Sequence, residues 1–179
     1  MKNFFFIIVI LVGFMSCNDK KKQDDLKPDF KENFSLELEV VASKKDDFTL
    51  YYTEDNTVSF VGGNAAWKGV NGGNIEEKII FDLSEEITPT DIRLDFGLNK
   101  LQDSVEIKNI KILYYGNEMS IKGSDFFNWF IKDEKFKTKT DVNNSSIKFF
   151  KSDNEWITPY FYPRQELIDA LSTLTNEKL

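Results

Sequence analysis

The side chains that could carry chemistry in this chain of 179 residues are carboxylates, lysines, hydroxyls and aromatic rings, since it has no histidine and one cysteine. Lack of an imidazole excludes Ser-His-Asp and Cys-His nucleophile arrangements, which need a base that titrates near pH 7. One cysteine excludes an intrachain disulfide and a cysteine-based zinc site. The net charge of −7 argues against nucleic acid as a partner, because phosphate binding requires clustered positive charge.

A glycine-rich segment with an aromatic residue at its centre is the first candidate site. Val61 to Asn74 holds five of the nine glycines together with Trp67. Aromatic rings beside amide side chains are typical of sugar sites, because ring faces stack on a sugar while amides hydrogen-bond its hydroxyls. We therefore expect Trp67, Asn71 and Asn74 to contact a ligand. The alternative is structural: the glycines form two turns around a short strand, Ala65 to Val70.

An arginine and an aspartate two residues apart are the second candidate site. The chain has only two arginines, and Arg93 alternates with apolar residues in step with Asp95. A planar guanidinium beside a carboxylate could bind a polar ligand bidentately. The structural alternative is an ion pair that closes a sheet edge.

The sequence around this pair resembles a known type of domain. R-L-D-F-G, following an I-x-F-D-L strand, resembles a segment of jelly-roll domains that occur in bacterial lipoproteins and beside sugar-transferring membrane proteins. The resemblance covers Phe34 to Leu113. It implies a carbohydrate-binding-like module.

The acidic residues predict neither catalysis nor metal binding. A glycosidase with two carboxylates is the simplest enzyme this composition allows, and it is kept as a minor alternative. Acidic pairs such as Asp46-Asp47, Glu76-Glu77 and Glu85-Glu86 lack the spacing of a calcium loop, so we expect them to be solvated. We therefore expect a protein that is not an enzyme, with no catalytic residue, no metal and no cofactor.

The first sixteen residues read as a signal peptide. Lys2 precedes an apolar run, Phe4 to Phe14, that is too short to cross a bilayer and fits a secretory signal. The following G-F-M-S-C resembles a bacterial lipobox, and Ser16 before Cys17 resembles the variant typical of Bacteroidota. The resemblance implies cleavage before Cys17 and acylation of that residue, which anchors the protein to membrane lipid. An ordinary signal peptide with a leftover thiol is the alternative.

Residues 17–32 are predicted to be an acylated, flexible tether. Asn18 to Pro28 (NDKKKQDDLKP) is too polar to repay the entropy cost of ordering. Asp24-Asp25 resembles the acidic export signals of Bacteroidota lipoproteins. We expect an outer-membrane lipoprotein, on the cell surface or on the periplasmic face.

Residues 33–179 are predicted to form one all-β domain, a two-sheet antiparallel β-sandwich of jelly-roll type with a C-terminal amphipathic helix. Period-two patterns predict the strands, and a phase slip at Lys108-Asn109 predicts a β-bulge. A hairpin is expected around Glu54-Asp55-Asn56, and Pro159 predicts an edge or bent strand. The expected strands are 34–41, 48–53, 57–61, 75–83, 92–96, 104–115, 146–151 and 156–162.

Two segments are predicted to be helical. Ser124 to Trp129 is expected to form one or two turns. Arg164 to Thr175 follows Pro163 and has an apolar stripe, so we expect it to lie across a sheet or an open end of the sandwich.

Two functions are expected besides the minor alternative of a glycosidase. We expect a membrane-anchored envelope lipoprotein whose sandwich is a non-catalytic binding module for glycans. The main alternative is an assembly protein that contacts an envelope protein through an exposed sheet edge.

Overall fold

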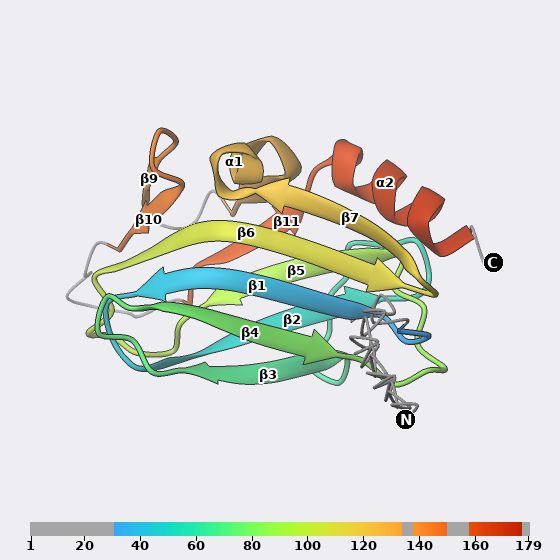
Figure 1. Ribbon diagram of the computed structural model, residues 1–179, viewed down its shortest axis with the longest axis horizontal. Helices are drawn as coiled ribbons and strands as arrows, with labels where there is room; N and C mark the ends of the chain where they lie inside the picture. The colour runs from blue at the N-terminus through green and yellow to red at the C-terminus, as the bar shows by residue number, and fades with distance from the viewer. Residues whose placement is uncertain (1–30, 134–137, 150–157, 177–179) are drawn as a thin grey trace, which may run out of the picture.

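The computed structural model describes residues 31–133, 138–149 and 158–176. Cys17, the lipobox and the tether up to residue 30 lie outside the described residues, as does Trp156. Within them the predicted fold class is confirmed: the chain forms two antiparallel sheets and a C-terminal helix. Figure 1 shows β1, β4 and β6 running in front of β2 and β5.

The chain crosses repeatedly from one sheet to the other. Sheet A has the order β4 (Glu76–Asp82), β1 (Ser35–Ala42), β6 (Ser104–Tyr114), β10 (Ser146–Lys148) and β9 (Lys139–Asp141), and β7 (Asn117–Lys122) also pairs with β6. Sheet B has the order β3 (Ala65–Val70), β2 (Asp46–Thr53), β5 (Asp91–Phe96), β11 (Tyr160–Pro163) and β8 (Phe130–Lys132).

The pairing is that of an antiparallel ribbon rolled into two layers. The pairs β2–β3 and β5–β11 lie in sheet B, while β1–β4 and β6–β10 lie in sheet A. This is a jelly-roll-like arrangement in which the segment after β7 supplies the last strand of each sheet. Strand β5 is thereby placed at the centre of sheet B.

The predicted bulge is confirmed. Glu39 of β1 lies opposite Asn109 of β6, but the next residue, Val40, lies opposite Ile107, so Lys108 is the extra residue. Alternation on β1 is otherwise regular, and its inward residues are fully buried. The bulge keeps the apolar residues of both halves of β6 pointing into the core. Without the extra residue, the apolar residues of one half would point to solvent.

Phenylalanine rings fill one end of the space between the sheets. Phe126 stacks on Phe130 at a centroid distance of 4.8 Å and meets Phe161 edge-on at 5.3 Å. Phe96 meets Phe48 edge-on at 5.3 Å. All five side chains are at most 1% exposed, so aromatic packing between the layers is a large part of the core.

Both predicted helices are present. Residues Gly123–Asp125 form a 3-10 turn that runs into α1 (Phe126–Trp129), and α2 is Gln165–Asn176. Leu167, Leu171 and Leu174 form the buried stripe of α2. The helix contacts α1 and two strands, β7 of sheet A and β11 of sheet B. It therefore closes one open side of the sandwich (Figure 1).

Two expectations about strands and one about a carboxylate were wrong. Residues 57–61 form no strand, and β2 pairs instead with β3, which the sequence offered as the structural alternative. Of the two alternatives predicted at Pro159, an edge or a bent strand, the edge is wrong, because β11 lies between β5 and β8. Asp46 is not solvated: it is 5% exposed and accepts hydrogen bonds from the backbone N–H groups of Leu98 and Asn99 and from Gln102.

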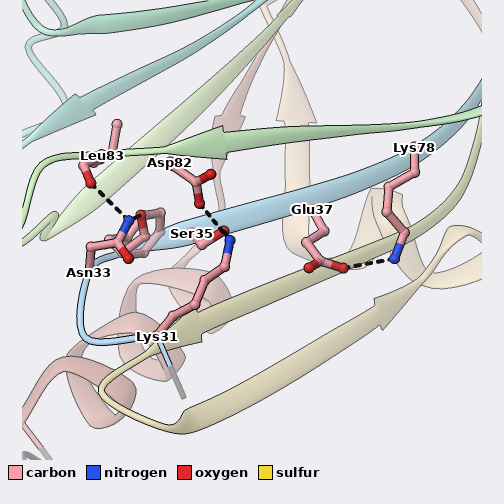
Figure 2. Close-up of polar contacts among 8 residues, drawn as sticks. Lys31, Asn33, Ser35, Glu37, Lys78, Asp82 and Leu83 are labelled. Atoms are coloured by element: carbon pink, nitrogen blue, oxygen red, sulfur yellow. Dashed lines mark hydrogen bonds and ion pairs between the residues drawn. The ribbon is translucent and has the colours of Figure 1, made fainter. Parts of the chain in front are cut away.

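The outer face of sheet A carries ion pairs. Lys78 of β4 contacts Glu37 at 2.9 Å and Glu39 at 3.5 Å on the neighbouring β1. Lys31 bonds Asp82 at 2.7 Å, as Figure 2 shows. These groups are partly exposed, so this face is an ordinary solvated sheet surface.

No helix in the described part of the chain is long and apolar enough to cross a bilayer.

Candidate functional site

The outer face of sheet B is aromatic where that of sheet A is charged. Five rings lie on it, and we call them the aromatic face: Tyr51 from β2, Phe60 from the loop after β2, Trp67 from β3, and Tyr160 and Tyr162 from β11. Solvent-facing positions of a sandwich are usually polar. A contiguous group of partly exposed rings on such a surface is typical of a binding site.

Strand register brings these residues together around Arg93 on the central strand. Arg93 lies opposite Tyr51, and Asp95 lies opposite Tyr160. Thr49 lies opposite Asp95 on one side and opposite Trp67 on the other. The face thus runs from β3 to β11, about 14 Å for three strand spacings.

Arg93 is surrounded by four of the five rings. Its guanidinium carbon lies 4.3 Å from the centroid of the Tyr51 ring and 4.6 Å from that of Tyr160. Phe60 and Tyr162 follow at 5.4 Å and 5.7 Å. All four distances are within the range of cation–π attraction, so one cation orients four aromatic side chains.

Asp95 occupies one edge of the same guanidinium. Arg93 Nε and Nη2 donate to the two oxygens of Asp95 at 2.8 Å and 2.9 Å. The arginine side chain is 14% exposed and the aspartate 9%. Burial raises the pKa of Asp95 to about 6, although its hydrogen bond and ion pair with Arg93 oppose this. The bidentate fork that the sequence suggested for a ligand is therefore already used inside the protein.

Trp67 is the most exposed member of the face. Its side chain is on the edge strand β3, is 49% exposed, and meets Tyr51 edge-on at a centroid distance of 6.5 Å. Tyr160 and Tyr162 also meet edge-on, at 5.4 Å. Burial and a hydrogen bond with the Asp133 side chain raise the pKa of Tyr160, so its hydroxyl is neutral at physiological pH.

The rings form a layer that covers polar side chains on the sheet. Four outward-pointing polar residues of β2 and β5 are at most 7% exposed: Thr49, Thr53, Asp91 and Asp95. Side chains at outward positions of a sheet are normally solvated. Here the aromatic side chains and the loop of residues 54–64 shield them.

The loop of residues 54–64 presents Phe60. Its two ends are held together by the bond from Tyr52 N to Asn64 O, at 3.1 Å. Phe60 packs against Tyr162 at a centroid distance of 5.9 Å. Val58 and Val61 on either side of it are more than half exposed, so the loop extends the apolar surface beyond the sheet.

Two of the five predicted ligand residues lie apart from this face. Asn71 and Asn74 are in the connection between β3 and β4, which crosses from one sheet to the other. Asn71 donates from its backbone and its side chain to Glu77, at 3.0 Å and 2.7 Å. Asn74 has a positive φ of 60° and bonds Ala42 O through its backbone. The structure gives both residues roles in the turn, while it places Trp67, Arg93 and Asp95 on one face.

Four residues of the face were not among the predicted site residues: Tyr51, Phe60, Tyr160 and Tyr162. A signal for the last two was present, since Tyr160 and Tyr162 flank the buried Phe161 in a period-two pattern. Nothing in the sequence near Phe60 indicates that its loop folds back over the sheet.

No protein-family model, no curated protein and no solved structure matches this chain. The function is therefore argued from the face itself.

Proposed function

We propose that the aromatic face of sheet B is a non-catalytic binding surface for a glycan, carried by a lipid-anchored protein of the cell envelope. The observation that carries the proposal is the contrast between the two outer faces. Sheet A has charged pairs in solvent, whereas sheet B has four rings around one cation and the exposed Trp67 beside them. Sugars offer apolar faces that stack on such rings.

A neutral glycan fits this face better than an acidic one. Arg93 is the cation of the face, and its charge is already balanced by Asp95. The whole chain is acidic, with a net charge of −7, which repels anionic ligands. What the face offers is ring surface and tyrosine hydroxyls, which suit stacking and hydrogen bonding to uncharged hydroxyl groups.

The arrangement of carboxylates favours binding over hydrolysis. Both oxygens of Asp95 are held by Arg93, which leaves them poorly placed to act on a substrate. Asp91 is four residues away on the same strand, about 13 Å. The carboxylates of glycosidases lie roughly 5–9.5 Å apart. The glycosidase alternative would need a different pair.

Anchoring remains part of the proposal. Acylation of Cys17 would hold the domain on a tether of about 20 Å, long enough for the aromatic face to reach surrounding polymers. Either face of the outer membrane is compatible with this arrangement.

The alternative of binding through a sheet edge has less support. In the described residues sheet B ends at β3 and β8. Sheet A ends at β4 on one side and, on the other, at β9 and at β7, which contacts α2. Strands β8 and β9 have three residues each, β3 contains Lys68 and Gly69, and β4 is rich in charge. Short or charged edges resist addition of another strand.

The experiment is a screen of the purified protein against a panel of neutral and acidic glycans, with affinities of the hits measured by calorimetry. Trp67→Ala should weaken binding at least tenfold, a loss of about 1.4 kcal/mol. Leu101→Ala is the matched control, because Leu101 is also exposed, at 63%, but lies in the loop between β5 and β6. Binding that is absent, or equal in the two variants, would contradict the proposal.

A further inference from the structure

Three aspartates are buried in the described part of the chain, and one of them has a carboxylate oxygen without a hydrogen-bond partner. Asp46 accepts four hydrogen bonds, and Asp95 is held bidentately by Arg93. Asp91 is the most buried of the three, at 2% exposure, yet its Oδ1 atom accepts no hydrogen bond. A buried carboxylate is normally paired, protonated or bound to a cation.

The surroundings of Asp91 are rich in oxygen. It begins β5, opposite Thr53 at the end of β2, and the loop of residues 54–64 closes over this corner. The Thr57 carbonyl oxygen lies there, 2.6 Å from Thr53 Oγ1. Thr90 Oγ1 lies 3.4 Å from Thr53 Oγ1. Hydroxyl, carbonyl and carboxylate oxygens are the ligands that calcium prefers.

The charge that perturbs Asp91 is negative. Burial and then the carboxylate of Asp55 raise the pKa of Asp91, while a hydrogen bond with Thr90 lowers it. Asp55 Oδ1 is used by Thr57, whose N–H and hydroxyl donate to it at 3.1 Å and 2.7 Å. The bond from Asn56 N to Thr90 Oγ1, at 3.0 Å, brings together the neighbours of Asp55 and Asp91. Two carboxylates close to one carboxylate oxygen without a partner make the corner attractive to a cation.

We propose that Asp91 and Asp55 bind a calcium ion beneath the loop of residues 54–64, with hydroxyl, carbonyl and water oxygens completing its shell. The described residues contain no group of three or more acidic, histidine or cysteine side chains that could hold a metal, so neutral oxygens must supply the remaining ligands. Calcium suits this mixture because its coordination is flexible, whereas magnesium demands a near-ideal octahedron. No Asp-rich loop motif is involved, which explains why spacing alone predicted no metal.

Calcium here would stabilise the loop that presents Phe60. The loop begins directly after Thr53 and returns at Asn64, so a tie between Asp55 and Asp91 would fix its first turn against β5. The site would thus be structural, and separate from the ring surface that contacts the glycan.

The test uses CaCl2 alone, followed by thermal unfolding and calorimetry of the purified protein after treatment with a chelator. Millimolar CaCl2 should raise Tm by several degrees and bind with one ion per chain, whereas NaCl at equal ionic strength should not. Asp91→Asn should remove both effects. Asp47→Asn is the matched control, since Asp47 is an exposed carboxylate at an outward position of β2 and should leave calcium binding unchanged.

Asp55→Asn keeps the amide oxygen that Thr57 needs but removes the charge, and it should weaken calcium binding at least tenfold even if Asp91→Asn fails to fold. An absence of heat and of any Tm shift in the wild type would overturn the proposal, as would equal binding by the wild type and the Asp55→Asn variant. These outcomes do not depend on glycan binding.

Discussion

At the scale of single residues, Arg93 organises the site. Its guanidinium contacts four rings within 6 Å and is bound by Asp95 along one edge. Because the pair is almost fully covered, its role is to position the aromatic side chains that meet solvent. The sequence indicated the importance of Arg93 and Asp95 but suggested direct ligand contact.

Replacing Arg93 by Met should destabilise the protein strongly. The substitution leaves Asp95 buried without its partner, which costs about 3–5 kcal/mol. Lys78→Met is the control, since its pair with Glu37 is partly exposed and is worth less than about 1 kcal/mol. Denaturant unfolding measures both free energies, and equal losses would show that the Arg93 pair is not buried in solution.

Stability should depend on pH through Asp95. Its folded pKa of about 6 lies above the value of about 3.9 for an unfolded aspartate, so the folded state holds the proton more tightly. The contribution of Asp95 to the free energy of unfolding is therefore complete below about pH 4 and is lost as the pH rises through about 6.

The contribution of Asp95 is measured as the free energy of unfolding of the wild type minus that of the Asp95→Asn variant. It should fall by up to about 3 kcal/mol between pH 4 and pH 7, because Asn does not titrate. A difference that stays constant, or that grows with pH, would mean that the pairing with Arg93 outweighs burial.

At the scale of elements, the periodic segments were predictable and the connections were not. The alternation of apolar and polar residues predicted β1, β5 and both halves of β6 with its bulge. The apolar stripe predicted α2. Strand β7 was missed because the turn before it has Tyr115 and Gly116 at positive φ, where Asn-Gly is the usual signal. Residues 57–61 have a strand-like composition, but the loop they form is held by tertiary contacts across the sheet.

The turn after β5 contains a glycine that the fold requires. Gly97 has a φ of +90°, and a Cβ there would lie 2.5 Å from Asp46 Oδ2. Gly97→Ala should therefore cost about 1–3 kcal/mol, since it strains the backbone and displaces the carboxylate that accepts bonds from Leu98 and Asn99.

Gly62→Ala is the control for this prediction. A Cβ at Gly62 meets nothing within 4 Å, so its effect should stay within about 0.5 kcal/mol. Thermal or denaturant unfolding compares the two variants, and a neutral Gly97→Ala would show that this turn can relax.

At the scale of the whole molecule, the rolled ribbon explains why one face is special. Strands β10 and β11, which pair with β6 and β5, come from the segment after β7, so Tyr160 and Tyr162 reach Arg93 only through pairing distant in sequence. The fold class followed from strand spacing and aromatic content. The composition of the face could not follow from either, because it depends on which strands are neighbours.

Lipid anchoring is a separate prediction at this scale. Cys17→Ser should move the protein from the membrane fraction to the soluble fraction, because the acyl chains provide the stable anchor. Fractionation of cells that express either form, followed by protease treatment of intact cells, measures anchoring and orientation. A variant that stays in the membrane fraction would mean that something other than acylated Cys17 holds the protein there.

The most direct test of the central claim is to map glycan binding by NMR on the labelled protein. With a bound neutral oligosaccharide, signals of Trp67, Tyr51, Tyr160 and Tyr162 on sheet B should shift in a saturable way. Those of Glu37, Lys78 and Lys111 on the outer face of sheet A should stay in place. Shifts centred on sheet A or on a sheet edge, or no saturable shift on the aromatic face with any neutral glycan of the panel, would contradict the account.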